Sequence, residues 1–147
     1  VPDPFLRHKV WRGINTDEVA EPNNFATVAA VAAFTKGEQW LDELRAYLAD
    51  NKKLVREFIS RNVPDVKVVP SKATYLLWFD CSAITDDAEV LVKFIRKTTG
   101  LFLTEGIEYG KPGKKFIRMN VACPRARVED GLLRLKTAVE KYESSKC

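Results

Sequence analysis

The chain has 147 residues, enough for one domain with a hydrophobic core of its own. Its 46% hydrophobic and 30% charged residues are typical of a globular protein and exclude the disordered and fibrous classes. Because 24 Lys and Arg are interspersed with 20 Asp and Glu, the net charge of +4 indicates a mixed solvated surface rather than a nucleic-acid or membrane partner.

The sequence argues against a membrane protein, a disulfide framework and a metal site. No run reaches the roughly 18 consecutive apolar residues of a membrane-spanning helix, and the opening "VPDPFLRHKVW" lacks the pattern of a secretory signal. Cys81, Cys123 and Cys147 are odd in number and far apart, which predicts reduced thiols in a soluble, cytoplasmic protein. His8 has no Cys or His at ligand spacing, so we expect no metal.

The first segment predicts one helix that needs outside partners. The chain opens without Met and with two prolines in four residues, so we expect a truncated protein. Residues 1–24 hold a basic stretch and the polar break "EPNN", and "FATVAAVAAF" then predicts a helix ending at Gly37. That helix is apolar nearly all round and needs burial on several sides, but little else in the chain is shaped to cover it.

A long helix and two strands follow. Apolar residues recur at helical spacing from Glu38 to Asn62, where "NVPD" ends the pattern. Residues 66–69 and 74–80 are rich in β-branched and aromatic side chains and predict strands.

The second half predicts a helix, two strands and a terminal helix. Asp86 with Glu89 indicates a capping box, and Gly100 stands where that helix should end. Residues 101–104 predict a short strand, and the turn-rich "EGIEYGKPGK" leads into the strand "FIRMNVA". The terminal helix follows from five apolar positions, Val128, Leu132, Leu135, Val139 and Tyr142. This order predicts an α+β fold, with a small, mostly antiparallel or mixed sheet of three to four strands covered on one face by helices.

The strand "FIRMNVA" carries a cation on one of its faces. Alternation points Ile117 and Met119 toward the helices and aims Arg118 and Asn120 at the opposite side. An arginine fork grips a carboxylate through two parallel hydrogen bonds. Periodicity alone leaves open the alternative that Arg118 is an exposed strand residue paired with a surface carboxylate.

Other motifs do not support a site. The glycines of "GIEYGKPG" lack the Walker A spacing, and Pro112 stands where Ser or Thr would bind magnesium. The basic loop lysines beside Tyr109 fit a solvated turn better than an RNA-binding strand. No Ser-His-Asp or Cys-His set can be assembled, and Asp86 and Asp87 are better explained as helix caps.

Four segments taken together resemble a known family. "GEQWLDELRAYLADNKKLV", "ATYLLWFDCS", "LTEGIEYG" and "KFIRMNVACPRARVEDGLLRL" resemble, in order and spacing, the C-terminal part of fold-type I pyridoxal-phosphate enzymes of aminotransferase class I and II. Within that family they are similar to the cystathionine β-lyase-like carbon–sulfur lyases. The resemblance covers essentially the whole chain.

The resemblance implies roles for four residues. Arg118 would bind the α-carboxylate of an amino-acid substrate, with Asn120 as its neighbour on the same face. Tyr109 would line the cleft, and Asn24 would lie near the active site of the partner subunit. Residues 1–37 would be one or two helices of the cofactor-binding large domain and its interface, residues 38–147 the small domain, and the parent protein a homodimer.

The resemblance also implies what the chain lacks. The family's cofactor-binding lysine lies before the first motif, and no lysine here stands in its context; Lys72 in "PSKATY" matches a small-domain strand instead. We therefore expect pyridoxal phosphate in the parent but not on this chain, no catalytic residue within the chain, and no activity from it alone. The parent reaction would be β-elimination at sulfur or, alternatively, transamination. A free-standing regulatory or nucleic-acid-binding α+β module is the alternative from another class.

Overall fold

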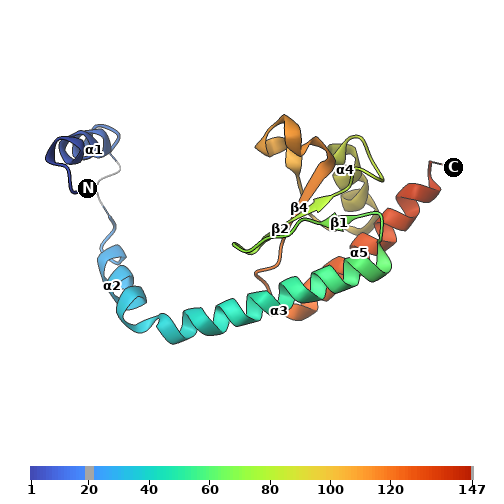
Figure 1. The fold of residues 1–147 in the computed structure, drawn as a ribbon, viewed down its shortest axis with the longest axis horizontal. Helices are drawn as coiled ribbons and strands as arrows, with labels where there is room; N and C mark the ends of the chain where they lie inside the picture. Colours follow the sequence, from blue (N-terminus) through green and yellow to red (C-terminus); the bar gives the residue numbers. More distant parts are fainter. Residues whose placement is uncertain (19–21, 147) are drawn as a thin grey trace. The chain divides into compact units, whose positions relative to one another are not determined.

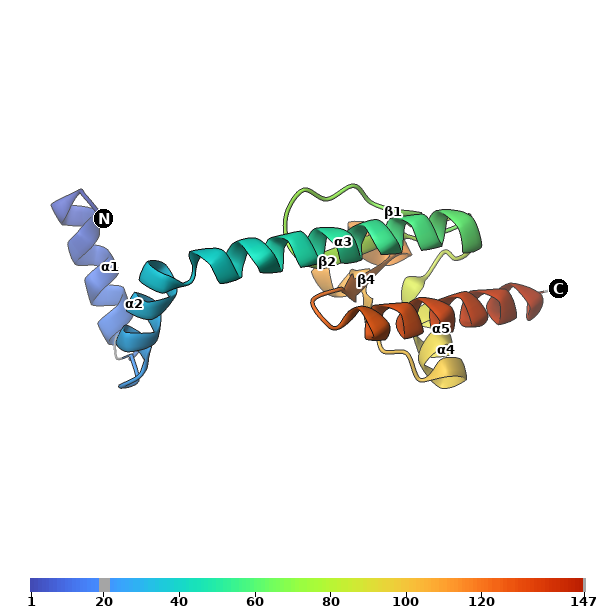
Figure 2. The ribbon, with the colours of Figure 1, turned by 90° about the horizontal axis from the view of Figure 1, so that it is seen from below.

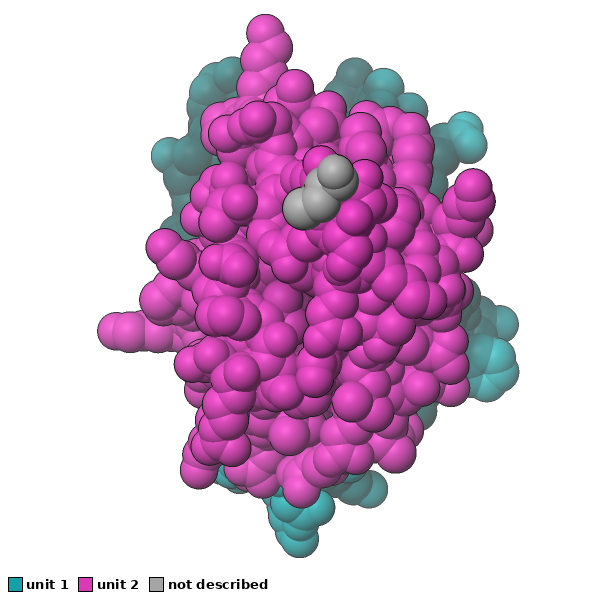
Figure 3. Space-filling model, turned by 90° about the vertical axis from the view of Figure 1, so that its right-hand side faces the viewer, with its two compact units in different colours: residues 1–44 teal, residues 45–147 magenta. Residues whose placement is uncertain are grey.

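The computed structural model describes residues 1–18 and 22–146. Cys147, and with it one of the three expected thiols, lies outside the described residues. The chain divides into two compact units, residues 1–44 and residues 45–147 (Figure 3), and each is described by itself.

The first unit consists of helices. α1 spans Pro4–Thr16, α2 spans Ala26–Lys36, and α3 begins at Glu38. Two helices within residues 1–37 agree with the one or two that the resemblance implied, although local pattern gave no bounds for α1. Asp3 is its N-cap, whose side chain accepts from the backbone N–H groups of Phe5 and Leu6, and Pro4 stands in the first turn. Neither α1 nor α2 has a buried residue.

The helix predicted to end at Gly37 is confirmed as α2, and its apolar side chains are exposed, as expected for a helix that needs outside partners. Within α2 the side chains of Val28 and Phe34 are 70% and 93% exposed. The unit described by itself therefore does not cover the apolar residues of α2.

The second unit is built on a four-stranded antiparallel sheet of order β1–β2–β4–β3 (Figure 1). The strands are β1 (Lys67–Val68), β2 (Leu76–Asp80), β3 (Thr104–Glu105) and β4 (Phe116–Asn120). The α+β class and the antiparallel sheet are confirmed. All four strands differ in extent from the prediction. β1 ends before Pro70, which has no N–H to donate, and β2 begins after Thr74, whose φ of 59° is left-handed. β3 begins only at Thr104, and β4 ends at Asn120, two residues earlier than predicted.

Helices cover one face of this sheet. α3 (Glu38–Asn62) and α5 (Arg125–Ser144) lie on the same side of it (Figures 1 and 2), and α4 (Ala88–Thr99) packs on α5. The core combines sheet residues with helix residues that are fully buried. Examples are Phe79 and Ile117 from the sheet and Val55, Leu91 and Leu132 from the helices, each 0% exposed. Burial of this apolar surface is the main stabilising contribution to the unit.

The start of α4 differs from the prediction by one residue. The N-cap is Asp87, whose Oδ1 accepts from the backbone N–H of Glu89 at 3.0 Å, and the capping box on Asp86 is wrong. Asp86 instead pairs with Lys115 at 2.6 Å. α4 ends at Thr99 and is followed by Gly100, as predicted. Gly100 has a left-handed φ of 72°, a conformation that glycine adopts without strain.

Candidate functional site

The two faces of β4 differ as the alternation predicted. Ile117 and Met119 are 0% and 5% exposed and belong to the core, whereas Arg118 is half-buried and Asn120 is exposed. Arg118 therefore lies on the sheet face that the core does not occupy.

Three elements surround the Arg118 guanidinium. Cross-strand pairing places Trp78 of β2 and Thr104 of β3 opposite Arg118. Thr104 Oγ1 accepts a long hydrogen bond of 3.4 Å from Arg118 Nη2, and the guanidinium carbon lies 4.7 Å from the centre of the Tyr109 ring. This second distance is that of a cation–π contact.

Arg118 has no carboxylate partner in the described parts of the chain, since no Asp or Glu there lies within salt-bridge distance of it. Pairing with a surface carboxylate, the alternative left open by periodicity, is therefore not observed among these residues. A half-buried cation held by a ring and a hydroxyl keeps donors that can bind an outside anion.

An aromatic hollow adjoins the arginine. It has a volume of about 350 Å³ and is lined by Val69, Trp78, Tyr109, Pro112, Gly113 and Phe116. The Trp78 ring meets those of Tyr109 and Phe116 edge to face, with centroids 5.4 and 6.2 Å apart. No lysine lines this hollow, and neither does any serine or threonine, so these residues do not fit a pyridoxal-phosphate site.

The loop before β4 is more ordered than "turn-rich" suggested. It forms two 3₁₀ helices, η1 (Gly106–Tyr109) and η2 (Lys111–Lys115), which touch through their glycines. A Cβ on Gly106 would lie 2.4 Å from the Gly113 carbonyl oxygen and 2.8 Å from the Trp78 ring. Only glycine allows this approach, and the approach fixes where Tyr109 lies.

Of the other three predicted site residues, only Tyr109 contacts the Arg118 side chain. Asn120 Oδ1 accepts from the backbone N–H of Ala122 at 2.8 Å, which stabilises the turn after β4. Tyr109 is 51% exposed and does lie against Arg118. Asn24 is exposed in the turn before α2, in the first unit, and the side chain that bonds to the backbone there is that of Asn23, which accepts from Phe25 N–H.

Sequence reasoning missed Trp78 and Thr104. Both were assigned to strands, but no partner could be named without the register that places each of them opposite Arg118. The alternation of β2 was an available signal, because Trp78 falls on the face opposite Leu77 and Phe79, which are buried.

A buried asparagine anchors the end of β4 to α3. Asn51 is 0% exposed, and its Nδ2 donates to the carbonyl oxygens of Val121 and Cys123 at 3.0 and 3.1 Å. Sequence reasoning missed this residue as well, since it stands among polar positions of a long amphipathic helix.

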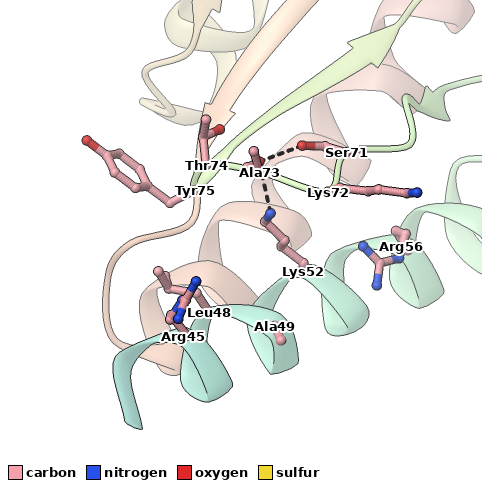
Figure 4. A pocket seen from close by; sticks show the side chains of 10 residues that line it. All are labelled: Arg45, Leu48, Ala49, Lys52, Arg56, Ser71, Lys72, Ala73, Thr74 and Tyr75. Carbon is pink, nitrogen blue, oxygen red and sulfur yellow. Dashed lines mark hydrogen bonds between the residues drawn. The ribbon is translucent and has the colours of Figure 1, made fainter. Parts of the chain in front are cut away.

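A basic cleft lies apart from the aromatic hollow, between α3 and residues 71–75 (Figure 4). Its volume is about 550 Å³, and its lining includes Arg45, Lys52, Arg56 and Lys72 with no acidic residue. Lys52 Nζ donates to the Ala73 carbonyl oxygen at 3.1 Å. The cleft shares no lining residue with the hollow, so its cations do not take part in the Arg118 site.

Neither a nucleophile nor a metal centre emerges from the described residues. Burial, reinforced by the charge of Asp80, raises the pKa of the Cys81 thiol to about 12, so this cysteine is unreactive. Hydrogen bonds from Ser82 lower the pKa of Asp80. No cluster of three His, Cys, Asp or Glu lies at ligand distance among residues 1–18 and 22–146, and no helix there is long and apolar enough to cross a membrane.

The sequence is similar to a protein family and to several of its characterised members. The family model of aminotransferase class I and II matches residues 16–135. The chain is 36% identical to cystathionine beta-lyase PatB of Bacillus subtilis over 140 residues, 95% of this chain and 36% of PatB. It is 32% identical to protein MalY of Escherichia coli over 123 residues, 84% of this chain and 32% of MalY.

A solved structure shares the fold. A PLP-bound protein of Clostridium difficile 630 superposes with a TM-score of 0.89 at 32% identity, covering 95% of this chain and 36% of that one. The chain thus spans about a third of the length of the relatives that it matches.

Proposed function

Since the chain belongs to the aminotransferase class I and II family, we propose that it forms the substrate-carboxylate side of the active site of a PLP-dependent enzyme. Arg118 binds the α-carboxylate of an amino acid, Tyr109 lines the same cleft, and Asn120 shapes the turn beside it. Residues 38–147 act as the small domain that closes over the substrate, and residues 1–37 belong to the large domain and subunit interface of a homodimer, where Asn24 faces the partner's active site.

The observation that carries this proposal is the state of Arg118. The guanidinium is half-buried, without a carboxylate partner in the described chain, and beside an apolar hollow. An arginine in such a place forms two strong hydrogen bonds to an incoming carboxylate, because low exposure to water strengthens charge-assisted bonds.

Pyridoxal phosphate, when bound to the complete protein, supplies the electron sink for reactions at the α-carbon. The residues that line the aromatic hollow do not fit as its site, so the contribution we assign to this face of the sheet is to hold and orient the carboxylate. The relatives named as cystathionine β-lyases favour β-elimination, in which cystathionine and water give homocysteine, pyruvate and ammonia. Transamination is the second candidate, and the role of Arg118 is the same in both reactions.

The nucleic-acid-binding alternative has no support from the basic loop. Lys115 and Lys114 pair with Asp86 and Asp87 at 2.6 and 3.6 Å. These lysines are thus partly neutralised by carboxylates of the same chain, and phosphate contacts would have to compete with those pairs.

The test is Arg118→Ala in the protein that the full coding sequence specifies, with L-cystathionine as substrate. We expect kcat/KM to fall roughly 10²- to 10³-fold, because two hydrogen bonds to a charged group contribute about 3–4 kcal/mol. Arg118→Lys should recover only a small part, since lysine cannot form the two parallel bonds.

The matched control is Arg96→Ala. Arg96 also lies over an aromatic ring, with its guanidinium carbon 4.9 Å from the centre of Phe102, but away from the hollow. Unchanged kcat/KM in Arg118→Ala, or an equal loss in Arg96→Ala, would contradict the proposed role. The 147-residue chain alone should neither turn over L-cystathionine nor develop a visible absorbance band with pyridoxal phosphate.

A further inference from the structure

We infer that Tyr109 is a positioning residue, a ring on which the Arg118 guanidinium is held in the orientation that receives the substrate carboxylate; this rests on the proposed function of Arg118. The inference joins the ring contact of 4.7 Å to the interlocked glycines of the loop that carries Tyr109.

The first step concerns the free movement of an arginine. Its long side chain loses considerable rotamer entropy when a ligand fixes it, and that loss weakens binding unless the side chain is held beforehand. The Tyr109 ring covers one face of the guanidinium, and Thr104 Oγ1 accepts from Nη2. The remaining N–H donors point along the guanidinium edges and stay available for a carboxylate.

The second step concerns what holds Tyr109. The ring is half exposed, but its edge-to-face contact with Trp78 has a centroid distance of 5.4 Å. The glycine contact of η1 with η2 fixes the backbone on which the ring stands, since a Cβ on Gly113 would lie 2.1 Å from the Gly106 carbonyl oxygen. The position of Tyr109 therefore follows from the packing of the loop and not from Arg118 itself.

The third step is the kinetic consequence. The carboxylate carries the same charge in the bound substrate and in the transition state, so an oriented guanidinium contributes equally to both. Tyr109→Leu removes the ring at similar size and should raise KM for L-cystathionine about 2- to 30-fold, the range of a cation–π contact, while kcat stays within about twofold.

Two variants serve as controls, one for loss of the Tyr109 hydroxyl and one for removal of an aromatic ring beside a different arginine. Tyr109→Phe keeps the ring face and should restore the KM that Tyr109→Leu loses. Phe102→Leu removes the ring under Arg96, at 4.9 Å, and should leave KM unchanged. Kinetics are measured on the protein from the full coding sequence, and the cofactor absorbance confirms equal loading.

A double-mutant cycle decides whether Tyr109 acts through Arg118. In an Arg118→Ala background, Tyr109→Leu should cause no further loss of kcat/KM. Independent losses that multiply would overturn the inference, and so would a Tyr109→Leu protein with unchanged KM. If Arg118→Ala alone has no effect, the proposed function fails instead.

A second readout does not depend on turnover. In the 147-residue chain with ¹⁵N-labelled arginine, the side-chain N–H signal of Arg118 should be shifted upfield by the Tyr109 ring, lose that shift in Tyr109→Leu and keep it in Tyr109→Phe. An Arg118 signal that Tyr109→Leu does not move would overturn the inference, whatever the kinetics of the complete protein.

Discussion

Asn51 is expected to hold in place the strand end that follows Arg118. It is fully buried on α3, and its amide donates to the carbonyl oxygens of Val121 and Cys123 at 3.0 and 3.1 Å. Its own Oδ1 has no hydrogen-bond partner among the described residues. The substitution Asn51→Ala therefore removes two hydrogen bonds and also removes one unsatisfied buried oxygen.

The magnitude follows from these contacts. Two hydrogen bonds contribute about 1–3 kcal/mol, and removing a buried oxygen that lacks a partner returns about 1 kcal/mol. The carbonyl groups left without their donor and the small cavity add about 1–2 kcal/mol. We expect Asn51→Ala to lower the free energy of unfolding of the second unit by about 2 kcal/mol.

The assay is urea unfolding of the 147-residue chain, followed by the fluorescence of Trp78. Trp11 and Trp40 belong to the first unit and are replaced by Phe, so that the signal reports the second unit alone. The control is Asn62→Ala, because the Asn62 amide donates only within its own helix, to Phe58 at 2.9 Å. Equal midpoints for Asn51→Ala and Asn62→Ala would refute the anchoring role.

Three further predictions concern the carboxylates at α4 and the buried thiol. Asp87→Ala should lower the free energy of unfolding by about 1 kcal/mol, the usual contribution of an N-cap, while Asp86→Ala leaves the urea midpoint unchanged; equal losses from both would contradict the assignment of the cap to Asp87. Cys81, in a Cys123→Ser, Cys147→Ser variant, should not react with a thiol reagent at pH 8 until urea unfolds the chain, because its pKa is raised to about 12. Its pKa is higher in the folded state than the ordinary 9.0, so unfolded chains lose the proton first and stability should fall as the pH rises past about 9.

Local signals in the sequence were sufficient for most helices. The apolar spacing of α3 and the breaks at Gly37 and Pro64 bound it at Glu38–Asn62, as the structure has it. The bounds of α1 were not predicted, although Asp3 and Pro4 are ordinary start signals and Leu6, Val10 and Ile14 recur at helical spacing.

The strands were predicted less well because their ends depend on pairing. β1 has only the residues that pair with Phe79 and Asp80, and β3 only those that pair with β4. The face of Arg118 could be predicted, since alternation is a property of β4 alone.

The partners of Arg118 could not be named from local pattern, although the alternation of β2 indicated the face on which Trp78 lies. Trp78 and Thr104 reach it through register, and Tyr109 reaches it through a loop whose path depends on contact between two glycines. Asn51 is the same kind of case, because its hydrogen-bond partners lie 70 and 72 residues away in the sequence. Such residues become visible only when the tertiary contacts are known.

The most direct test of carboxylate binding by Arg118 compares two ligands that differ only in that group. L-Alanine and L-alaninol, in which a hydroxymethyl group replaces the carboxylate, are titrated as inhibitors of the protein from the full coding sequence and of its Arg118→Ala variant. The unchanged protein should prefer L-alanine by roughly 10²-fold, as expected for paired charge-assisted hydrogen bonds, and the variant should bind both ligands about equally. A preference for L-alanine that survives in Arg118→Ala would contradict the assignment of Arg118 as the carboxylate-binding residue.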